Sequence, residues 1–244
     1  EASMEENQSK PYFLILDEMN LSHVERYFAD FLSVMETKEN IFLHSGDIDW
    51  NGVPAELSLP MNLFIVGTVN IDETTYMFSP KVLDRANVIE FRVSEKDMEQ
   101  YLVNSSEVNL QRLKGSGKDM AFEFIQIATE ISYKPADING LNEILKQFFN
   151  RLKKTGAEFG YRTASEIYRF VAIVNKIEPD ASMPNTIDAA IMQKLLPKIH
   201  GSRKKLDKFL KILGALCLQE GVEIDTYIND YLKSEIDFTD ISKI

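Results

Sequence analysis

Two adjacent carboxylates, Asp17 and Glu18, are the residues of this sequence whose types and position best suit chemistry. They directly follow an unbroken apolar run, residues 12–16, which is typical of a parallel strand buried on both faces. Ligands bind at the carboxyl ends of the strands in open α/β sheets. Because burying adjacent carboxylates is costly without a compensating positive group, the pair predicts a metal-bound phosphate. The alternative is a strand that simply ends in two solvated acids.

A second apolar run, residues 61–70, ends in Asn70 and predicts another buried parallel strand. Its carboxyl end should bring Asn70 to the same edge of the sheet as Asp17. A third strand is expected at residues 87–91, after a short helix within 79–86 that has proline at its first position. Parallel strands connected through helices indicate an α/β fold for this part of the chain.

Two capping boxes, each a Ser or Thr followed three residues later by Glu, predict where two helices begin. Ser22 and Glu25 precede an apolar stripe that runs to about residue 35, and Thr163 and Glu166 open a later helix. Arg162 directly precedes the second box, so it should lie at the mouth of that helix.

A β-hairpin is expected between the first two strands. Two short extended runs, residues 41–43 and 53–59, flank a turn rich in Gly, Asp and Asn that carries Trp50. Trp50 could contact a partner from the hairpin tip, or it could fold back onto the hairpin.

From about residue 95 the spacing of apolar residues indicates helices alone. The predicted organisation is a loop or linker in residues 1–10, an α/β part in residues 11–95 and a helical part in residues 96–244. The polar first residues, without an initiating Met, are typical of a loop cut from a longer chain. The predicted helical segments are residues 120–131, 141–152, 163–174, 187–196 and 206–218.

Composition limits the classes of function. The net charge of -11 argues against a broad nucleic-acid surface, although a narrow basic pore escapes this argument. The single cysteine, Cys217, excludes a disulfide framework, and no apolar run approaches ~18 residues, so we expect a cytoplasmic protein without a membrane span. His23, His44 and His200 lack further ligands at suitable spacing, and no zinc site is expected.

In this order the motifs resemble the carboxyl-terminal two thirds of an AAA+ nucleoside triphosphatase, specifically the McrB-like branch found in modification-dependent restriction systems. Residues 13–18, FLILDE, are similar to a Walker B strand, and residues 67–70, GTVN, to a sensor 1 strand. Residues 83–85, LDR, are similar to an arginine-finger position, and residues 160–162, GYR, to the sensor 2 start of a helical lid. The resemblance covers roughly residues 10–218.

The resemblance implies a partial AAA+ P-loop core, with parallel strands, flanking helices and a hairpin insert, followed by an all-α lid. It implies that Asp17 serves Mg²⁺, that Glu18 polarises the attacking water, and that Asn70 orients this water. Arg85 would reach the nucleotide of a neighbouring subunit, and Arg162 would contact phosphate from the lid. The alternatives are structural ion pairs, Arg85 with the adjacent Asp84 and Arg162 with Glu166.

The sequence departs from the family pattern at two places. Residues 71–75, IDETT, lack the Asp-Arg pair that follows the sensor asparagine in McrB, which bears on coupling to a McrC-like nuclease. No G-x-x-x-x-G-K-[ST] occurs in the 244 residues, so the phosphate-binding loop is expected upstream of residue 1, and these residues alone are expected to be inactive.

The function implied is that of a ring-shaped motor, a hexamer by the resemblance, that hydrolyses ATP or GTP. Its substrate would be DNA in a restriction system, which is an analogy at the level of the family. A catalytically dead scaffold that keeps the fold for protein interaction is one alternative, and a protein-remodelling AAA+ chaperone is another.

Overall fold

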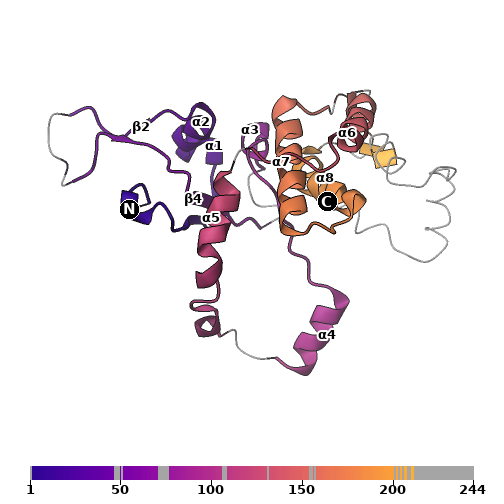
Figure 1. The fold of residues 1–244 in the computed structure, drawn as a ribbon, viewed down its shortest axis with the longest axis horizontal. Coiled ribbons are helices and arrows are strands. Elements are labelled where there is room, and N and C mark those ends of the chain that lie inside the picture. The colour runs from indigo at the N-terminus through magenta and orange to yellow at the C-terminus, as the bar shows by residue number, and fades with distance from the viewer. Residues whose placement is uncertain are drawn as a thin grey trace. The chain divides into compact units, whose positions relative to one another are not determined.

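In the computed structural model the chain divides into two compact units, residues 1–132 and 133–244 (Figure 1). The predicted division lay earlier, between residues 95 and 96, whereas the helices of residues 96–132 group with the strands. The structure describes residues 2–46, 50, 52–70, 77–105, 109–130, 132–153, 156, 158–200, 202, 204, 206, 207, 210 and 211. Within these residues, the helices are all too short or too polar to cross a membrane.

The first unit is built on two parallel strands. β1 (Tyr12–Leu16) pairs with β4 (Leu63–Gly67) in a register that sets Tyr12 opposite Leu63 and Leu16 opposite Gly67. This confirms both predicted strands and their parallel pairing. Because the register continues past the strand ends, the residue after Gly67 lies beside the residue after Leu16, which is where the acids begin.

The amino-terminal segment is anchored at the start of these strands. It contains a short 3-10 helix, η1 (Glu5–Asn7). The side-chain amide nitrogen of the buried Asn62 lies 3.0 Å from the carbonyl oxygens of Ala2, Asn7 and Lys10. Residues 2–10, which belong to the expected loop or linker, are therefore held to the start of β4 through the Asn62 side chain, which contacts their backbone carbonyls.

One face of the strand pair is covered by three short helices, α1 (Val24–Tyr27), α2 (Ala29–Thr37) and α3 (Pro80–Leu83). Proline occupies the first turn of α3, as predicted, because its missing N–H costs nothing there. The apolar cluster between the helices and the strands consists of Val24, Phe28, Leu32 and Val82, with Leu14, Leu16 and Ile65 packed against it.

The opposite face is only partly covered. Phe124 of α5 (Ala121–Thr129) lies over the strands, with its ring centroid 4.8 Å from that of Phe64 and 6.0 Å from that of Phe13. Ile15 nevertheless remains 65% exposed. The prediction that β1 is buried on both faces is therefore wrong for the described residues, because α5 covers only part of the second face.

The first predicted capping box is also wrong. A 3-10 turn, η2 (Met19–Leu21), follows the acids, and α1 begins at Val24 with no side-chain hydrogen bond at its start. Glu25 instead accepts a hydrogen bond of 2.9 Å from the backbone N–H of Ser79, the residue that precedes α3. The carboxylate is thus used to cap another helix, which local spacing cannot reveal.

The third predicted strand, residues 87–91, is not a strand. Within it Ile89 and Phe91 are exposed, Phe91 to 94%. A strand forms only where a neighbour takes its backbone hydrogen bonds. β1 and β4 pair with each other, and no other described segment pairs with residues 87–91.

The predicted hairpin is present but short, formed by β2 (Ile41–Phe42) and β3 (Glu56–Leu57) in antiparallel pairing. The ring of Trp50 stacks on His44, with centroids 5.1 Å apart and planes inclined by 8°. Trp50 therefore folds back onto the hairpin, as the alternative reading holds, while 56% of its surface stays exposed.

The remaining elements described in the first unit are helices. α4 (Glu95–Val103) begins with a capping box in which the Ser94 hydroxyl accepts from the N–H of Asp97 and the Asp97 carboxylate accepts from the N–H of Ser94. The short 3-10 helices η3 (Leu110–Leu113) and η4 (Lys118–Met120) lead into α5.

The second unit contains α6 (Ile138–Lys153), α7 (Tyr161–Ile177), α8 (Met183–Lys194) and the 3-10 turn η5 (Leu196–Lys198). These confirm the helices predicted in residues 141–152, 163–174 and 187–196, whereas most of 206–218 lies outside the described residues. The core between the helices is formed by Leu141, Leu145, Phe148, Leu152, Ile167, Val171, Ile187, Ala190, Ile191 and Leu195.

The second capping box is wrong for the same reason as the first. α7 begins two residues before Thr163, and the buried Thr163 hydroxyl accepts a 2.8 Å hydrogen bond from the ammonium group of Lys198. Glu166 forms an ion pair with Lys194, whose side chain is only 1% exposed. Both residues of the box thus contact cations that follow α7 in the chain.

Candidate acidic site at the strand edge

Asp17 and Glu18 lie in the turn that directly follows β1, and both side chains are exposed. The desolvation cost that suggested a compensating metal therefore does not apply to the chain as described. Glu18 has φ 48° and ψ 47°, in the left-handed region that residues other than glycine seldom occupy. Strain of this kind is commonly found at functional sites, where neighbouring contacts hold it in place.

Thr68 is the neighbour that holds this turn. Its hydroxyl donates a 2.5 Å hydrogen bond to Oδ1 of Asp17 and accepts a 2.8 Å hydrogen bond from the backbone N–H of Glu18. The sequence alone did not single out Thr68. The signal that could have done so is the register, since a residue that directly follows Gly67 must lie beside Asp17.

Asn70 lies at the same edge, as the strand ends predicted. Its side-chain Nδ2 donates to Oε1 of Glu18 at 3.2 Å. Asn20, only 3% exposed, donates from its own amide to the backbone carbonyl of Asn70 at 3.2 Å. The structure therefore brings Asp17, Glu18 and Asn70 together, and it adds Asn20 as the residue that holds the backbone of Asn70.

Gly67 explains how closely the turn approaches β4. A Cβ atom built at this position would lie 2.5 Å from the sulfur of Met19, which is closer than real contacts allow. The backbone of Met19 is held in the same place by a 2.9 Å hydrogen bond from its N–H to the carbonyl of Thr68. A side chain at position 67 would therefore require the Met19 side chain to move, because the added Cβ would also lie in van der Waals contact with the Cβ of Met19, at 3.4 Å.

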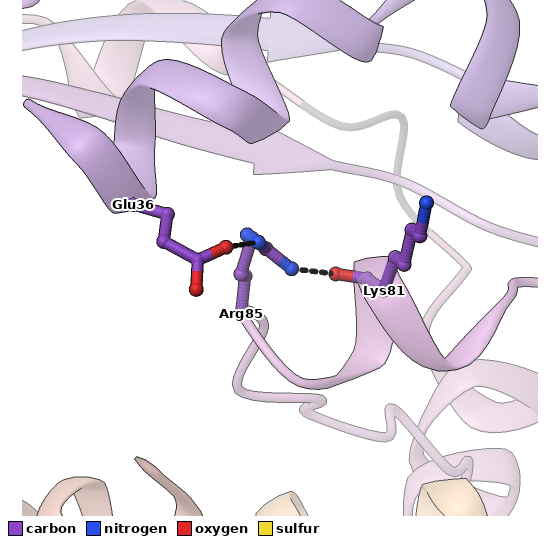
Figure 2. Close-up of polar contacts among 3 residues, drawn as sticks. All are labelled: Glu36, Lys81 and Arg85. Atoms are coloured by element: carbon purple, nitrogen blue, oxygen red, sulfur yellow. Dashed lines mark hydrogen bonds and ion pairs between the residues drawn. The ribbon is translucent and has the colours of Figure 1, made fainter. Parts of the chain in front are cut away.

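Arg85 follows α3 and faces its own chain (Figure 2). Its guanidinium forms an ion pair with Glu36 of α2 and donates a 2.6 Å hydrogen bond to the carbonyl of Lys81. The side chain is 14% exposed. The partner is thus a residue of α2, which neither the arginine-finger role nor the alternative pairing with Asp84 had suggested.

Arg162 belongs to the second unit, where it lies half-buried in the first turn of α7. Lys198 reaches the same turn through its hydrogen bond to Thr163. Glu166, the alternative partner considered for Arg162, forms its ion pair with Lys194.

The oxygen atoms at the strand edge suit a hard cation in part. Mg²⁺ is usually bound through one or two carboxylates, with water and substrate phosphates completing its shell. Asp17 and Glu18 supply two carboxylates, and Oδ2 of Asp17 makes no hydrogen bond within the described residues. Within the described residues, no group of three or more His, Cys, Asp or Glu side chains is arranged to hold a metal ion. The donor set fits a metal ion whose shell is completed by water or by phosphate oxygens, without a third protein carboxylate.

Fold and site together define a first unit with parallel strands, helices and an acidic strand edge, and a second unit whose described residues form helices and no strand. Residues 109–240 match the model of a family described as a domain of unknown function (DUF8727). The match covers more than half of the 244 residues, and the chain belongs to this family. No curated protein and no solved structure matches this chain. The matched range includes Arg162, whereas the acidic edge and Arg85 precede it.

Proposed function

We propose that this chain carries the metal-binding and water-activating edge of an AAA+ nucleoside triphosphatase, together with its helical lid. The observation that supports the proposal most is the convergence of Asp17, Glu18 and Asn70 at the carboxyl ends of two hydrogen-bonded parallel strands. This is the edge at which α/β sheets bind ligands. The McrB-like motif order adds the resemblance stated above.

Asp17 would hold Mg²⁺ bound to the phosphates of ATP or GTP, because one of its oxygens makes no hydrogen bond to the described residues. Glu18 would take a proton from the attacking water. Its hydrogen bond to Asn70 places an amide and a carboxylate side by side, as expected for a pair that orients one water molecule. When bound, Mg²⁺ would neutralise charge that develops on the phosphates.

The assembly that the resemblance implies is a homo-oligomeric ring, a hexamer in this branch, with DNA and a McrC-like nuclease as further partners and the cytoplasm as its compartment. In such a ring Arg85 would complete the site of the neighbouring subunit, and Arg162 would contact phosphate from the lid. To reach the phosphate of a neighbouring subunit, the guanidinium of Arg85 would first have to break its ion pair with Glu36 of the same chain.

The same ion pair favours a second candidate, a scaffold that keeps the fold without catalysis. A mostly buried arginine that pairs with α2 and hydrogen-bonds Lys81 has a sufficient structural role. The two candidates differ in what Glu18 does, since a scaffold needs neither its carboxylate nor its hydrogen bond to Asn70.

The test uses a chain in which these residues are joined to a phosphate-binding loop, as the proposal requires. Glu18→Gln should keep nucleotide binding, measured with a fluorescent analogue, and should lower phosphate release by a factor on the order of 10² or more. Asp17→Ala should weaken Mg²⁺-dependent nucleotide binding as well. Glu99→Gln, an exposed acid of α4, is the matched control and should behave as the unmodified protein. Unchanged hydrolysis in Glu18→Gln would overturn the role proposed for Glu18, whereas absence of hydrolysis in the unmodified protein would favour the scaffold.

A further inference from the structure

Thr68 hydrogen-bonds to four consecutive residues, the last residue of β1 and the first three of the turn that follows it. Its N–H donates to the carbonyl of Leu16 at 3.0 Å, and its carbonyl accepts from the N–H of Met19 at 2.9 Å. Between these backbone bonds, its hydroxyl donates to the Asp17 carboxylate and accepts from the N–H of Glu18. The backbone bonds depend only on β4, but the two hydroxyl bonds depend on the residue type at position 68.

The hydroxyl oxygen of Thr68 therefore makes a hydrogen bond with each of the two acidic residues. Its single proton is used on Oδ1 of Asp17, which leaves Oδ2 of that carboxylate without a hydrogen bond in the described chain. One of its lone pairs accepts from the N–H of Glu18, whose backbone is in the left-handed conformation. A side chain without a hydroxyl would free the rotation of the Asp17 carboxylate and remove the acceptor that favours this conformation.

We propose that Thr68 is a positioning residue that orients Asp17 for a divalent cation and fixes the turn that presents Glu18. This inference deepens the proposed function and rests on it, because a cation at this edge is part of that function. Residues that hydrogen-bond a metal-ligating carboxylate typically change metal affinity or activity by about 10–100-fold when they are replaced. The effect of Thr68 is carried by its hydroxyl, so Ser should replace it and Val should not.

The first measurement concerns the turn and uses hydrogen exchange of individual backbone amides in the 244-residue chain. Thr68→Val keeps the shape of the side chain and removes the hydroxyl, so the amide of Glu18 should exchange faster by roughly fivefold or more. The amide of Met19 is the internal control, because its acceptor is the backbone carbonyl of residue 68. Equal acceleration of both amides would mean that the strand end itself had loosened, which contradicts a specific role of the hydroxyl.

The second measurement concerns the cation and uses Mn²⁺ as the probe, without nucleotide. Paramagnetic broadening of the amide signals of residues 17–19 reports Mn²⁺ bound at the strand edge. Thr68→Val should require at least about tenfold more Mn²⁺ for the same broadening, and Thr68→Ser should stay within about threefold of the unmodified chain. Asp17→Ala should abolish the broadening.

Two outcomes of the Mn²⁺ titration would overturn the inference: equal Mn²⁺ binding by Thr68→Val and the unmodified chain, or equal weakening in Thr68→Val and Thr68→Ser. Absence of broadening at residues 17–19 in the unmodified chain would overturn it too, since no cation would then need positioning. The titration needs no hydrolysis. A chain that binds Mn²⁺ as expected, while Glu18→Gln leaves hydrolysis unchanged, would refute the catalytic role of Glu18 and leave the role of Thr68 supported.

Discussion

The ion pair between Arg85 and Glu36 decides whether this arginine is a structural residue or a mobile one. It joins the end of α3 to α2, and Arg85 also donates to the carbonyl of Lys81 (Figure 2). The informative perturbations are Glu36→Ala, Arg85→Ala and the double variant. Together they give the coupling energy between the two side chains without counting the hydrogen bond to Lys81.

The magnitude follows from how much of each partner is exposed. Exposed ion pairs contribute about 0.2–1 kcal/mol, whereas removing one partner of a buried pair costs about 3–5 kcal/mol. Arg85 is 14% exposed but Glu36 is 46% exposed, so solvent screens the pair substantially. We therefore expect a coupling of about 1 kcal/mol, and a total loss of about 2 kcal/mol for Arg85→Ala, which also loses the hydrogen bond to Lys81.

Urea unfolding followed by far-UV circular dichroism measures these free energies in the 244-residue chain. The matched control is the pair of Lys146 with Glu143 on α6, where both side chains are about two-thirds exposed, and its coupling should stay below about 0.5 kcal/mol. A coupling between Arg85 and Glu36 no larger than that of the control would refute this account of the pair. In the assembled protein, Glu36→Gln should then raise hydrolysis if Arg85 acts on a neighbouring site, and should leave hydrolysis unchanged if Arg85 is structural.

Three further predictions test other parts of the chain. Combining Arg85→Ala subunits with Glu18→Gln subunits in one ring should restore measurable phosphate release, because some interfaces then pair an intact Glu18 with an intact Arg85; mixed rings without any activity would contradict a shared site. The contact with Ser79, followed by the backbone N–H of Glu25 itself, lowers the pKa of Glu25 below its ordinary value of 4.5, although burial offsets part of this shift. Its contribution to stability is therefore complete above pH 4.5 and is lost as the pH falls through the lowered folded-state pKa; acid unfolding of Glu25→Gln should lack this loss. Leu141→Ala should lower the free energy of unfolding by about 2–5 kcal/mol in urea titrations, since Leu141 is fully buried in the core of the second unit.

The strand edge could be predicted from the sequence because its signals are local. An unbroken apolar run that ends in polar residues gave β1 and β4, and parallel strands with aligned ends must bring Asp17 and Asn70 to one edge. The helices of the second unit followed from apolar spacing in the same way. The extent of burial was not predictable, because it depends on which elements cover each face, and α5 covers only part of one.

The two failed capping boxes share a physical cause. Glu25 and Glu166 stand at the correct spacing for capping boxes, but one caps a different helix and the other pairs with Lys194. A carboxylate accepts hydrogen bonds from the donor that the fold brings closest to it. When this donor lies far away in the sequence, the local spacing of residues cannot predict it. The same holds for Arg85, whose partner Glu36 lies 49 positions away in the chain.

These long-range contacts connect the acidic edge to the helix that carries Arg85. The hydroxyl of Tyr27 in α1 donates to the carbonyl of Met19, which directly follows the acids, at 2.9 Å. Two residues earlier in the same helix, Glu25 caps α3 through Ser79, and Arg85 lies just beyond the end of α3. α1 therefore contacts the turn of the acids with one side chain and the start of α3 with another. Under the proposed function, any shift of that turn when a cation binds would act on α1, which also contacts the start of the helix that precedes Arg85.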